Sequence, residues 1–247
     1  METLDLAEYG DYPVYNDLKV TIDFDPDPLN PRTEFDNLGT FAMYHKNCDY
    51  GDEKEFSEPK DLMKFLKEEN CEFLPVYMID HGGIGFSTSS YNDSWDSGQV
   101  GVIYITPDDI VKNFGKDTPE TRELARKCLR HEIETVNAYA SGEVYGFEVK
   151  TPFGIYDSCW GFYGQEGKED CIKEALSSYD DLCKNFATPE ATRNFIKENK
   201  ENYNHIPMEC RTLEASKQYI KAGGDIKSVP SKHIKSVTLK DDTSLKM

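Results

Sequence analysis

Short stretches in which hydrophobic residues alternate with polar ones, or cluster over several positions, predict β-strands in this chain. The most apolar is the hexapeptide VGVIYI at residues 100–105. A glycine turn is expected to join one strand to its return strand within residues 82–90, and a turn near Pro152 and Gly154 predicts a hairpin. The predicted strands are residues 18–24, 41–45, 73–80, 82–90, 100–105, 144–149 and 155–162.

Apolar residues that recur every three or four positions predict helices between and after these strands. Three of the helices have a clear start signal, because Thr106, Thr118 and Thr188 each offer a capping hydroxyl and are each followed by proline. Gly142 is expected to end the second of these three helices. The predicted helices cover residues 58–70, the stretch after 106, 119–141, 168–186, 188–199 and 213–222.

The mixture of strands and helices does not follow a regular βαβ order, which favours an α+β fold. We expect a mixed or antiparallel sheet packed against several helices. The predicted organisation is an acidic lead-in at residues 1–17, an α+β core at 18–187, a helical extension at 188–222 and a basic flexible tail at 223–247.

The charge of the chain narrows the classes of partner. Its 247 residues carry a net charge of −18 and the pI is about 4.7. Direct binding to nucleic acid or to an anionic membrane is therefore not expected, because both need Lys and Arg to face the phosphates. No apolar run approaches the roughly 20 residues of a membrane span, and no signal peptide is visible, so we expect a cytoplasmic protein.

The acidic residues are concentrated in the first quarter of the chain. Residues 1–61 hold 16 acidic and 5 basic residues. Gathered on one face, they would attract a cationic partner or copy the charge of a phosphate backbone; the alternative is a solvated acidic surface. Trp95 lies in the polar loop at residues 94–99. An exposed tryptophan there would suit the same contact; the alternative is that its ring folds back onto the core. The predicted partner-binding residues are Asp23, Asp25, Asp27, Asp49, Asp52, Glu53, Glu55, Trp95 and Asp96.

The residues that carry chemistry are few and scattered. Asp80-His81 precedes a glycine cluster that lacks the following helix of a phosphate loop, so a tight turn is the simpler interpretation. An alternative function, a small hydrolase or transferase, would use Asp80, His81 and Cys159, with Asp96 nearby.

The seven cysteines include no CxxC pair and predict no disulfide framework. Cys128, Cys171 and Cys183 lie on apolar helix faces and are expected to be buried. His45-x2-Cys48 and His205-x4-Cys210 have zinc-like spacing, but nothing in the sequence brings the two pairs together. No metal site and no cofactor are predicted.

Six segments of the chain resemble a family of hypothetical proteins encoded by tailed phages and mobile elements. The resemblance covers about residues 18–176, and the segments are 36–40, His45 (followed here by Lys46-Asn47, where family members often have two arginines), 50–52, 95–101, 142–146 and 159–164. It implies a phage or mobile-element origin and carries no catalytic role.

Such elements often encode small acidic inhibitors of host defence nucleases. We therefore expect a non-enzymatic accessory protein that binds the basic surface of a host nuclease or nucleic-acid-binding complex, acting as a nucleic-acid (DNA) mimic. A third hypothesis is an assembly protein with a tyrosine-rich interface.

Overall fold

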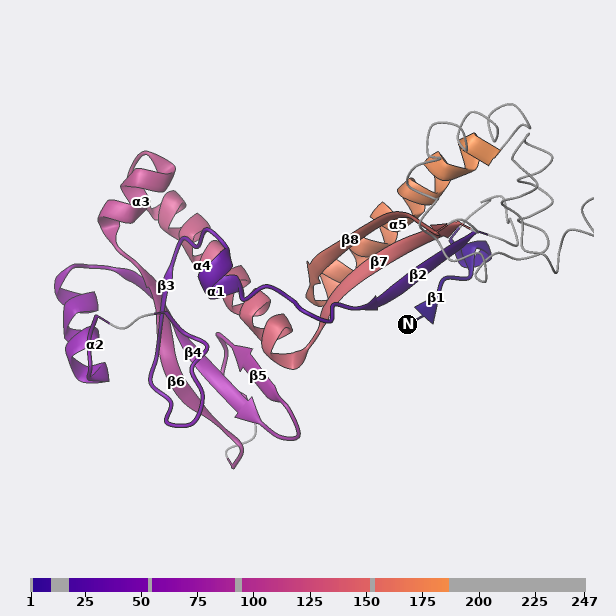
Figure 1. Ribbon diagram of the computed structural model, residues 1–247. Coiled ribbons are helices and arrows are strands. Elements are labelled where there is room, and N and C mark those ends of the chain that lie inside the picture. The colour runs from indigo at the N-terminus through magenta and orange to yellow at the C-terminus, as the bar shows by residue number, and fades with distance from the viewer. Residues whose placement is uncertain (1, 10–17, 53–54, 92–94, 152–153, 187–247) are drawn as a thin grey trace, which may run out of the picture. The chain divides into compact units, whose positions relative to one another are not determined.

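The computed structural model describes residues 2–9, 18–52, 55–91, 95–151 and 154–186, and it contains two compact units. Among the described residues, the first unit holds 2–9, 18–24, 145–151, 154–160 and 168–186. The second unit holds 25–52, 55–91, 95–144 and 161–167. Each unit is built on its own four-stranded sheet (Figure 1).

The sheet of the first unit has the order β1-β2-β7-β8, formed by Glu2–Thr3, Lys19–Phe24, Val144–Thr151 and Gly154–Tyr163. In the antiparallel β2–β7 pair, Val20 lies opposite Val149. A short 3-10 turn, η1 (Leu6–Glu8), follows β1. Helix α5 (Gly164–Phe186) has a buried stripe at three- and four-residue spacing, made by Cys171, Ala175, Tyr179 and Leu182.

The sheet of the second unit has the order β3-β6-β4-β5, and its neighbouring strands are antiparallel. Its strands are β3 (Thr40–Met43), β4 (Glu72–Asp80), β5 (Ile84–Ser87) and β6 (Ser97–Ile105). The helices of this unit are α1 (Pro31–Glu34), α2 (Pro59–Glu68), α3 (Pro107–Phe114) and α4 (Pro119–Ser141).

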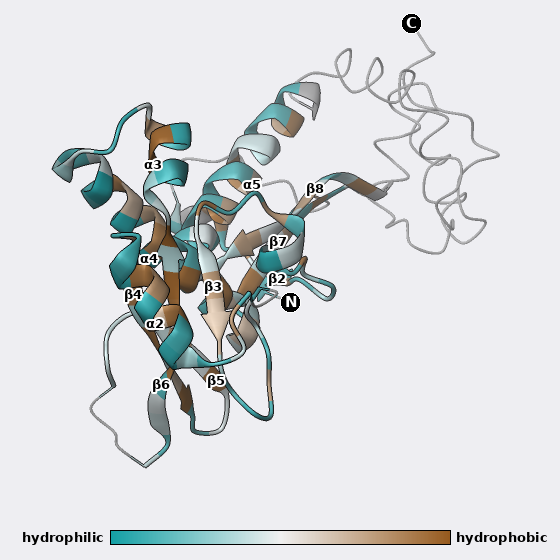
Figure 2. Ribbon diagram, turned by 90° about the vertical axis from the view of Figure 1, so that its left-hand side faces the viewer, coloured by the Kyte–Doolittle hydropathy of each residue, from teal (hydrophilic) through white to brown (hydrophobic). Residues whose placement is uncertain are grey.

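Both faces of this second sheet are covered, since successive residues of its strands point to opposite sides. Phe41 and Ile103 join the cluster that contains Leu129 of α4. Their neighbours Ala42 and Val102 belong instead to a cluster with Leu62 and Leu66 of α2. In Figure 2 the ribbon of β4 is largely hydrophobic, whereas α2 turns hydrophilic residues to the viewer. The strand pattern is therefore apolar on both faces near the middle of the sheet.

The helix boundaries follow the signals in the sequence. Thr106 and Thr118 cap α3 and α4 by accepting a hydrogen bond from the backbone N–H three residues later. Gly142 ends α4 in the left-handed conformation, with φ of 72°.

The α+β class and the positions of the predicted strands within 18–162 are confirmed. Helix α1 is not among the predicted helices: it begins at Pro31, at the end of the proline-rich residues 25–32 (DPDPLNPR), with Asn30 as its cap. The predicted helices at 188–199 and 213–222, the tail at 223–247 and most of the lead-in lie outside the described residues.

One burial prediction is wrong. Cys128 is exposed, as is Leu124. The buried stripe of α4 passes through Ala125, Leu129 and Ile133, so Cys128 lies one position to the side of it. Cys171 and Cys183 are buried, as predicted.

Candidate functional site

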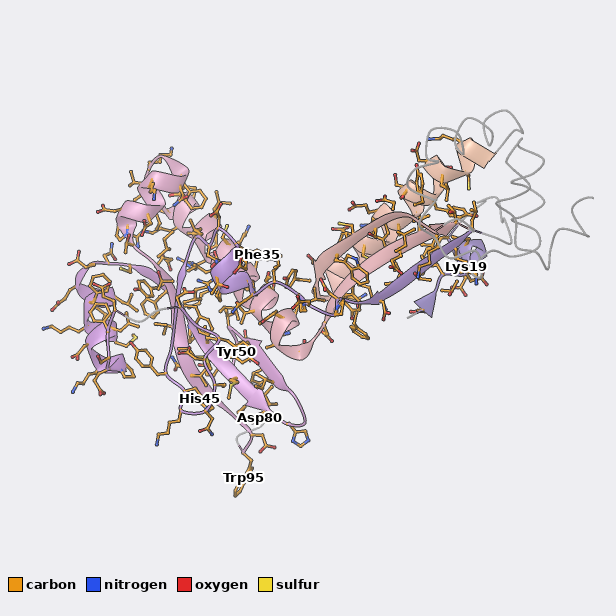
Figure 3. The ribbon with its side chains drawn as sticks, in the orientation of Figure 1. Lys19, Phe35, His45, Tyr50, Asp80 and Trp95 are labelled. Carbon is orange, nitrogen blue, oxygen red and sulfur yellow. The ribbon has the colours of Figure 1, made fainter. Side chains whose placement is uncertain are left out.

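The most exposed aromatic side chain of the described residues stands at one end of the second sheet. Trp95 is 93% exposed and lies two residues before the start of β6. We call this region the Trp95 tip and define it as Asp80, His81, Trp95 and Asp96. Figure 3 shows Trp95 pointing away from the end of the sheet at which Asp80 and His45 are labelled.

Hydrogen bonds hold the two strands of the tip together. The backbone N–H of Asp80 donates to the carbonyl of Asp96 at 2.9 Å, next to the β4–β6 pair Ile79–Ser97. Beyond Asp80 the chain turns at Gly82, whose φ is 75°. The strand register, which the isolated sequence does not reveal, is what brings Asp80 and Asp96 face to face.

His81 is paired with a carboxylate of the tip. Its Nδ1 lies 2.8 Å from Asp96 Oδ2, although 77% of the imidazole is exposed. A histidine–aspartate pair can act as a general base, but this pair is open to water rather than enclosed in a cleft. Its geometry serves better to hold the Asp96 carboxylate beside Trp95.

The other predicted partner-binding residues are spread over the molecule. Asp23 lies on β2 of the first unit, whereas Asp25 and Asp27 form a turn before α1, in which Asp25 accepts the N–H of Asp27. Glu55 is exposed before α2, and Glu53 lies outside the described residues. Asp49 is exposed, and both it and Asp80 lie near enough to Cys48 to act on its charge. Of these residues, Asp49 therefore shares a neighbour, Cys48, with Asp80 of the Trp95 tip.

Asp52 has a different role, because it forms a buried ionic cluster with Arg32. The Arg32 side chain is 3% exposed, and all five of its N–H groups have an acceptor. Nε and Nη2 donate to the two carboxylate oxygens of Asp52, Nη1 to Glu132 and Asn37, and Nη2 also to the carbonyl of Gly39. Asp52 therefore has a structural role and is not available to bind a partner.

The partners of Arg32 are satisfied in turn. Glu132 also accepts the backbone N–H groups of Leu38 and Gly39, and Asp52 accepts that of Phe41. Burial alone would lower the pKa of Arg32, but its hydrogen bonds to Asp52 and Glu132 raise it, so the guanidinium stays charged. Two of the segments that carry the resemblance, 36–40 and 50–52, thus meet here in a structural cluster that the sequence analysis did not foresee.

The residues of the alternative catalytic site belong to different units. Asp80 and His81 lie in the second unit, whereas Cys159 lies on β8 in the first. Burial, followed by the charge of Glu174, raises the pKa of the Cys159 thiol. A nucleophilic cysteine needs a lowered pKa, so the thiol has the opposite tuning. The catalytic alternative stays a prediction without support from this geometry.

The described thiols are expected to react very unequally with an alkylating reagent at pH 8. Cys128 is exposed and should be modified first. Burial raises the pKa of Cys171 to about 12, so only about one thiol in 10,000 is ionised at that pH, and the thiolate is the reactive form. Timed iodoacetamide labelling followed by peptide mass spectrometry measures both rates.

In that experiment, labelling of the urea-unfolded chain is the control and should remove the difference between the two peptides. Equal rates for Cys128 and Cys171 in the native protein would contradict the packing of α5.

A polar pocket lies between β8 and α5 in the first unit. Its volume is about 600 Å³, and it is lined by Tyr156, Asp157, Glu174, Ser177, Ser178, Asp180, Asp181 and Lys184. Ser178 donates a hydrogen bond to Asp157, and Lys184 forms ion pairs with both Asp180 and Asp181. These three carboxylates therefore already have partners among the residues that line the pocket. Organic cofactors favour apolar, enclosed pockets, whereas this pocket is polar and open to solvent.

Among the described residues, no group of three His, Cys, Asp or Glu side chains is arranged to hold a metal ion. None of the helices in the described ranges has the length and apolar character needed to cross a bilayer.

No protein-family model, curated protein or solved structure matches the chain. The resemblance to phage-encoded proteins therefore stays a prediction. The geometry and charge of the described residues are what support a function.

Proposed function

We propose that this protein is a phage-type accessory protein, not an enzyme, that binds and blocks a basic surface of a host nucleic-acid-handling complex. The observation that carries the proposal is the 93% exposure of Trp95, beside Asp80 and Asp96, on a chain of net charge −18. Tryptophan is one of the residues that most often dominate the binding energy of an interface, so the exposed Trp95 suits a surface that a partner covers.

The chemistry of the Trp95 tip selects a cationic partner. Arginine can stack its guanidinium on an indole ring and donate paired hydrogen bonds to a carboxylate at the same time. Trp95 supplies the ring, and Asp80 and Asp96 supply carboxylates on either side of one backbone hydrogen bond. Basic surfaces rich in arginine are the ones that hold nucleic acid, so a partner of this kind would lose its nucleic acid on binding.

The charge of the whole chain supports the same partner. A net charge of −18 speeds the approach of a cationic protein and repels nucleic acid itself. The long-range part of this attraction is screened by salt, because the Debye length falls from about 10 Å at 0.1 M to about 3 Å at 1 M.

The test is displacement of labelled duplex DNA from purified bacterial defence nucleases by the full chain, over a series of salt concentrations. We expect the protein to compete with DNA for at least one nuclease, and its own affinity for that nuclease, measured without DNA, to fall as salt rises. Asp80→Asn should weaken the competition more than Glu134→Gln, which removes one negative charge from an exposed position on α4.

Two outcomes would count against the proposal. Nuclease binding that is indifferent to salt would remove the electrostatic argument. Equal effects of Asp80→Asn and Glu134→Gln would show that net charge alone, rather than the Trp95 tip, makes the contact.

A further inference from the structure

A histidine, a cysteine and a methionine meet beside the core of the second unit. His45 and Cys48 belong to the loop that follows β3, and Met78 lies on β4. The Sγ atom of Cys48 is 3.1 Å from Nδ1 of His45 and 3.7 Å from Sδ of Met78. His45 is labelled in Figure 3 at the same end of the sheet as Asp80.

The contacts of His45 indicate that its Nδ1 carries a lone pair. The backbone N–H of Asn47 donates to this nitrogen at 3.4 Å, and the thiol of Cys48 lies on it as well. Nδ1 is therefore an acceptor, which leaves the ring proton on Nε2. The thiol of Cys48 therefore lies within reach of two atoms that each offer a lone pair, the imidazole Nδ1 of His45 and the thioether Sδ of Met78.

The loop that carries His45 and Cys48 is tied back onto β3. The N–H of Asp52 donates to the carbonyl of Phe41 at 2.8 Å, and the N–H of Tyr50 donates to Sδ of Met43 at 3.3 Å. Cys48 packs against the same core cluster that contains Met78, which is 7% exposed. The two sulfur donors are therefore held by packed elements before any ligand arrives, and His45 lies on the same loop as Cys48.

We propose that His45, Cys48 and Met78 bind one Cu(I) ion through Nδ1, Sγ and Sδ. Binding breaks the S–H bond of Cys48, forms a sulfur–copper bond and releases one proton to water; no electron is transferred, because the ion enters as Cu(I).

The donor distances suit one shared ion. Metal–sulfur bonds of about 2.3 Å and metal–nitrogen bonds of about 2.0 Å place neighbouring donors roughly 3.5–4 Å apart. The Cys48–Met78 distance of 3.7 Å already lies in that range. The Cys48–His45 distance of 3.1 Å must widen by about half an ångström, which the half-exposed His45 ring can supply.

The choice of ligands selects copper rather than zinc. Thiolate and thioether ligands are soft and favour Cu(I), whereas zinc is bound by Cys, His and carboxylates, and the thioether of methionine is not among its usual ligands. A histidine beside a cysteine can also activate the thiol as a nucleophile, and His45 and Cys48 could form such a pair. That function would give no role to the thioether of Met78. The carboxylates of Asp49 and Asp80 lie close enough to act on Cys48, and they favour a cation there.

The experiment titrates the full chain, anaerobically and below one equivalent, with Cu(I) held by a chromogenic chelator. We expect one tightly held ion in the wild-type protein, in Met63→Leu and in Cys128→Ser. Met78→Leu keeps the core volume and should weaken binding about tenfold or more, and Cys48→Ser should abolish it. X-ray absorption at the copper edge should report two sulfur ligands and one nitrogen, falling to one sulfur in Met78→Leu.

His45→Gln is the further variant, since its side chain is not part of the packed core, and it should also lose the ion. Equal affinity in Met78→Leu and Met63→Leu would overturn the proposal, because the thioether would then not be a ligand. Retention of the ion by Cys48→Ser, or tighter binding of Zn(II) than of Cu(I), would overturn it as well.

Discussion

Replacement of Arg32 by methionine is expected to lower the free energy of unfolding by about 3–5 kcal/mol. Methionine keeps much of the packing volume but leaves the carboxylates of Asp52 and Glu132 facing each other without a cation between them. It also leaves Asn37 and the carbonyl of Gly39 without the guanidinium that donates to them. Urea denaturation followed by circular dichroism measures the change.

Arg126→Met is the matched control for Arg32→Met. Arg126 also lies 2.7 Å from a carboxylate, that of Glu72, but its side chain is 40% exposed, so water replaces the lost contact. We expect a loss of about 0–1 kcal/mol. If the two variants were destabilised equally, the burial of the Arg32 cluster would have no energetic consequence.

The Arg32 cluster also explains why a charged residue is tolerated at 3% exposure. A buried ion pair does not by itself stabilise a fold, because desolvation offsets the attraction. Here every donor of the guanidinium is satisfied, and the cluster joins α1, the start of β3 and α4. We infer that its main effect is to fix how these three elements pack.

Replacement of Trp95 by alanine is expected to weaken binding to the nuclease partner by about 2 kcal/mol or more, which is ~30-fold in Kd. The reason is that a tryptophan at the centre of an interface contributes far more than its neighbours. The stability of the free protein should change by less than about 0.5 kcal/mol, since the side chain is 93% exposed. Calorimetric titration and denaturation of the same samples measure both quantities.

Trp160→Phe is the control for the aromatic substitution. Trp160 is 39% exposed on β8, where its ring packs against Gly146. It should keep the affinity of the wild-type protein, and in this background Trp95 is the single tryptophan that reports on binding by its fluorescence. An unchanged Kd in Trp95→Ala would mean that the Trp95 tip is not the contact surface.

The local signals in the chain were sufficient for most of the secondary structure. The start of α4 at Pro119 and its end at Gly142 could be read directly, because capping and the left-handed turn depend on the residues at those positions alone. Helix α1 was missed although Asn30 caps it and Pro31 opens it, because four residues are too few to show an apolar periodicity. The contacts of its Arg32, with partners 5 to 100 positions away in the chain, could not be predicted from local signals.

The candidate sites show the same division. The exposure of Trp95 was one of two alternatives that the sequence left open, because an indole can equally fold back onto a core. The pairing of Asp80 with Asp96 depends on the register of β4 and β6, and the meeting of Cys48 with Met78 depends on a loop returning across the sheet. Residue spacing does not encode either contact.

The sequence by itself determined the α+β class, the order of the strands and helices, and the large negative charge of this protein, since periodicity, capping and composition are local or additive properties. The tertiary structure alone decided that Asp52 is engaged with Arg32, that Cys128 faces solvent and that His45 and Met78 both contact Cys48. Those outcomes depend on which segments, distant in the chain, come within a few ångströms of one another in the folded protein. Local sequence patterns do not specify such long-range contacts.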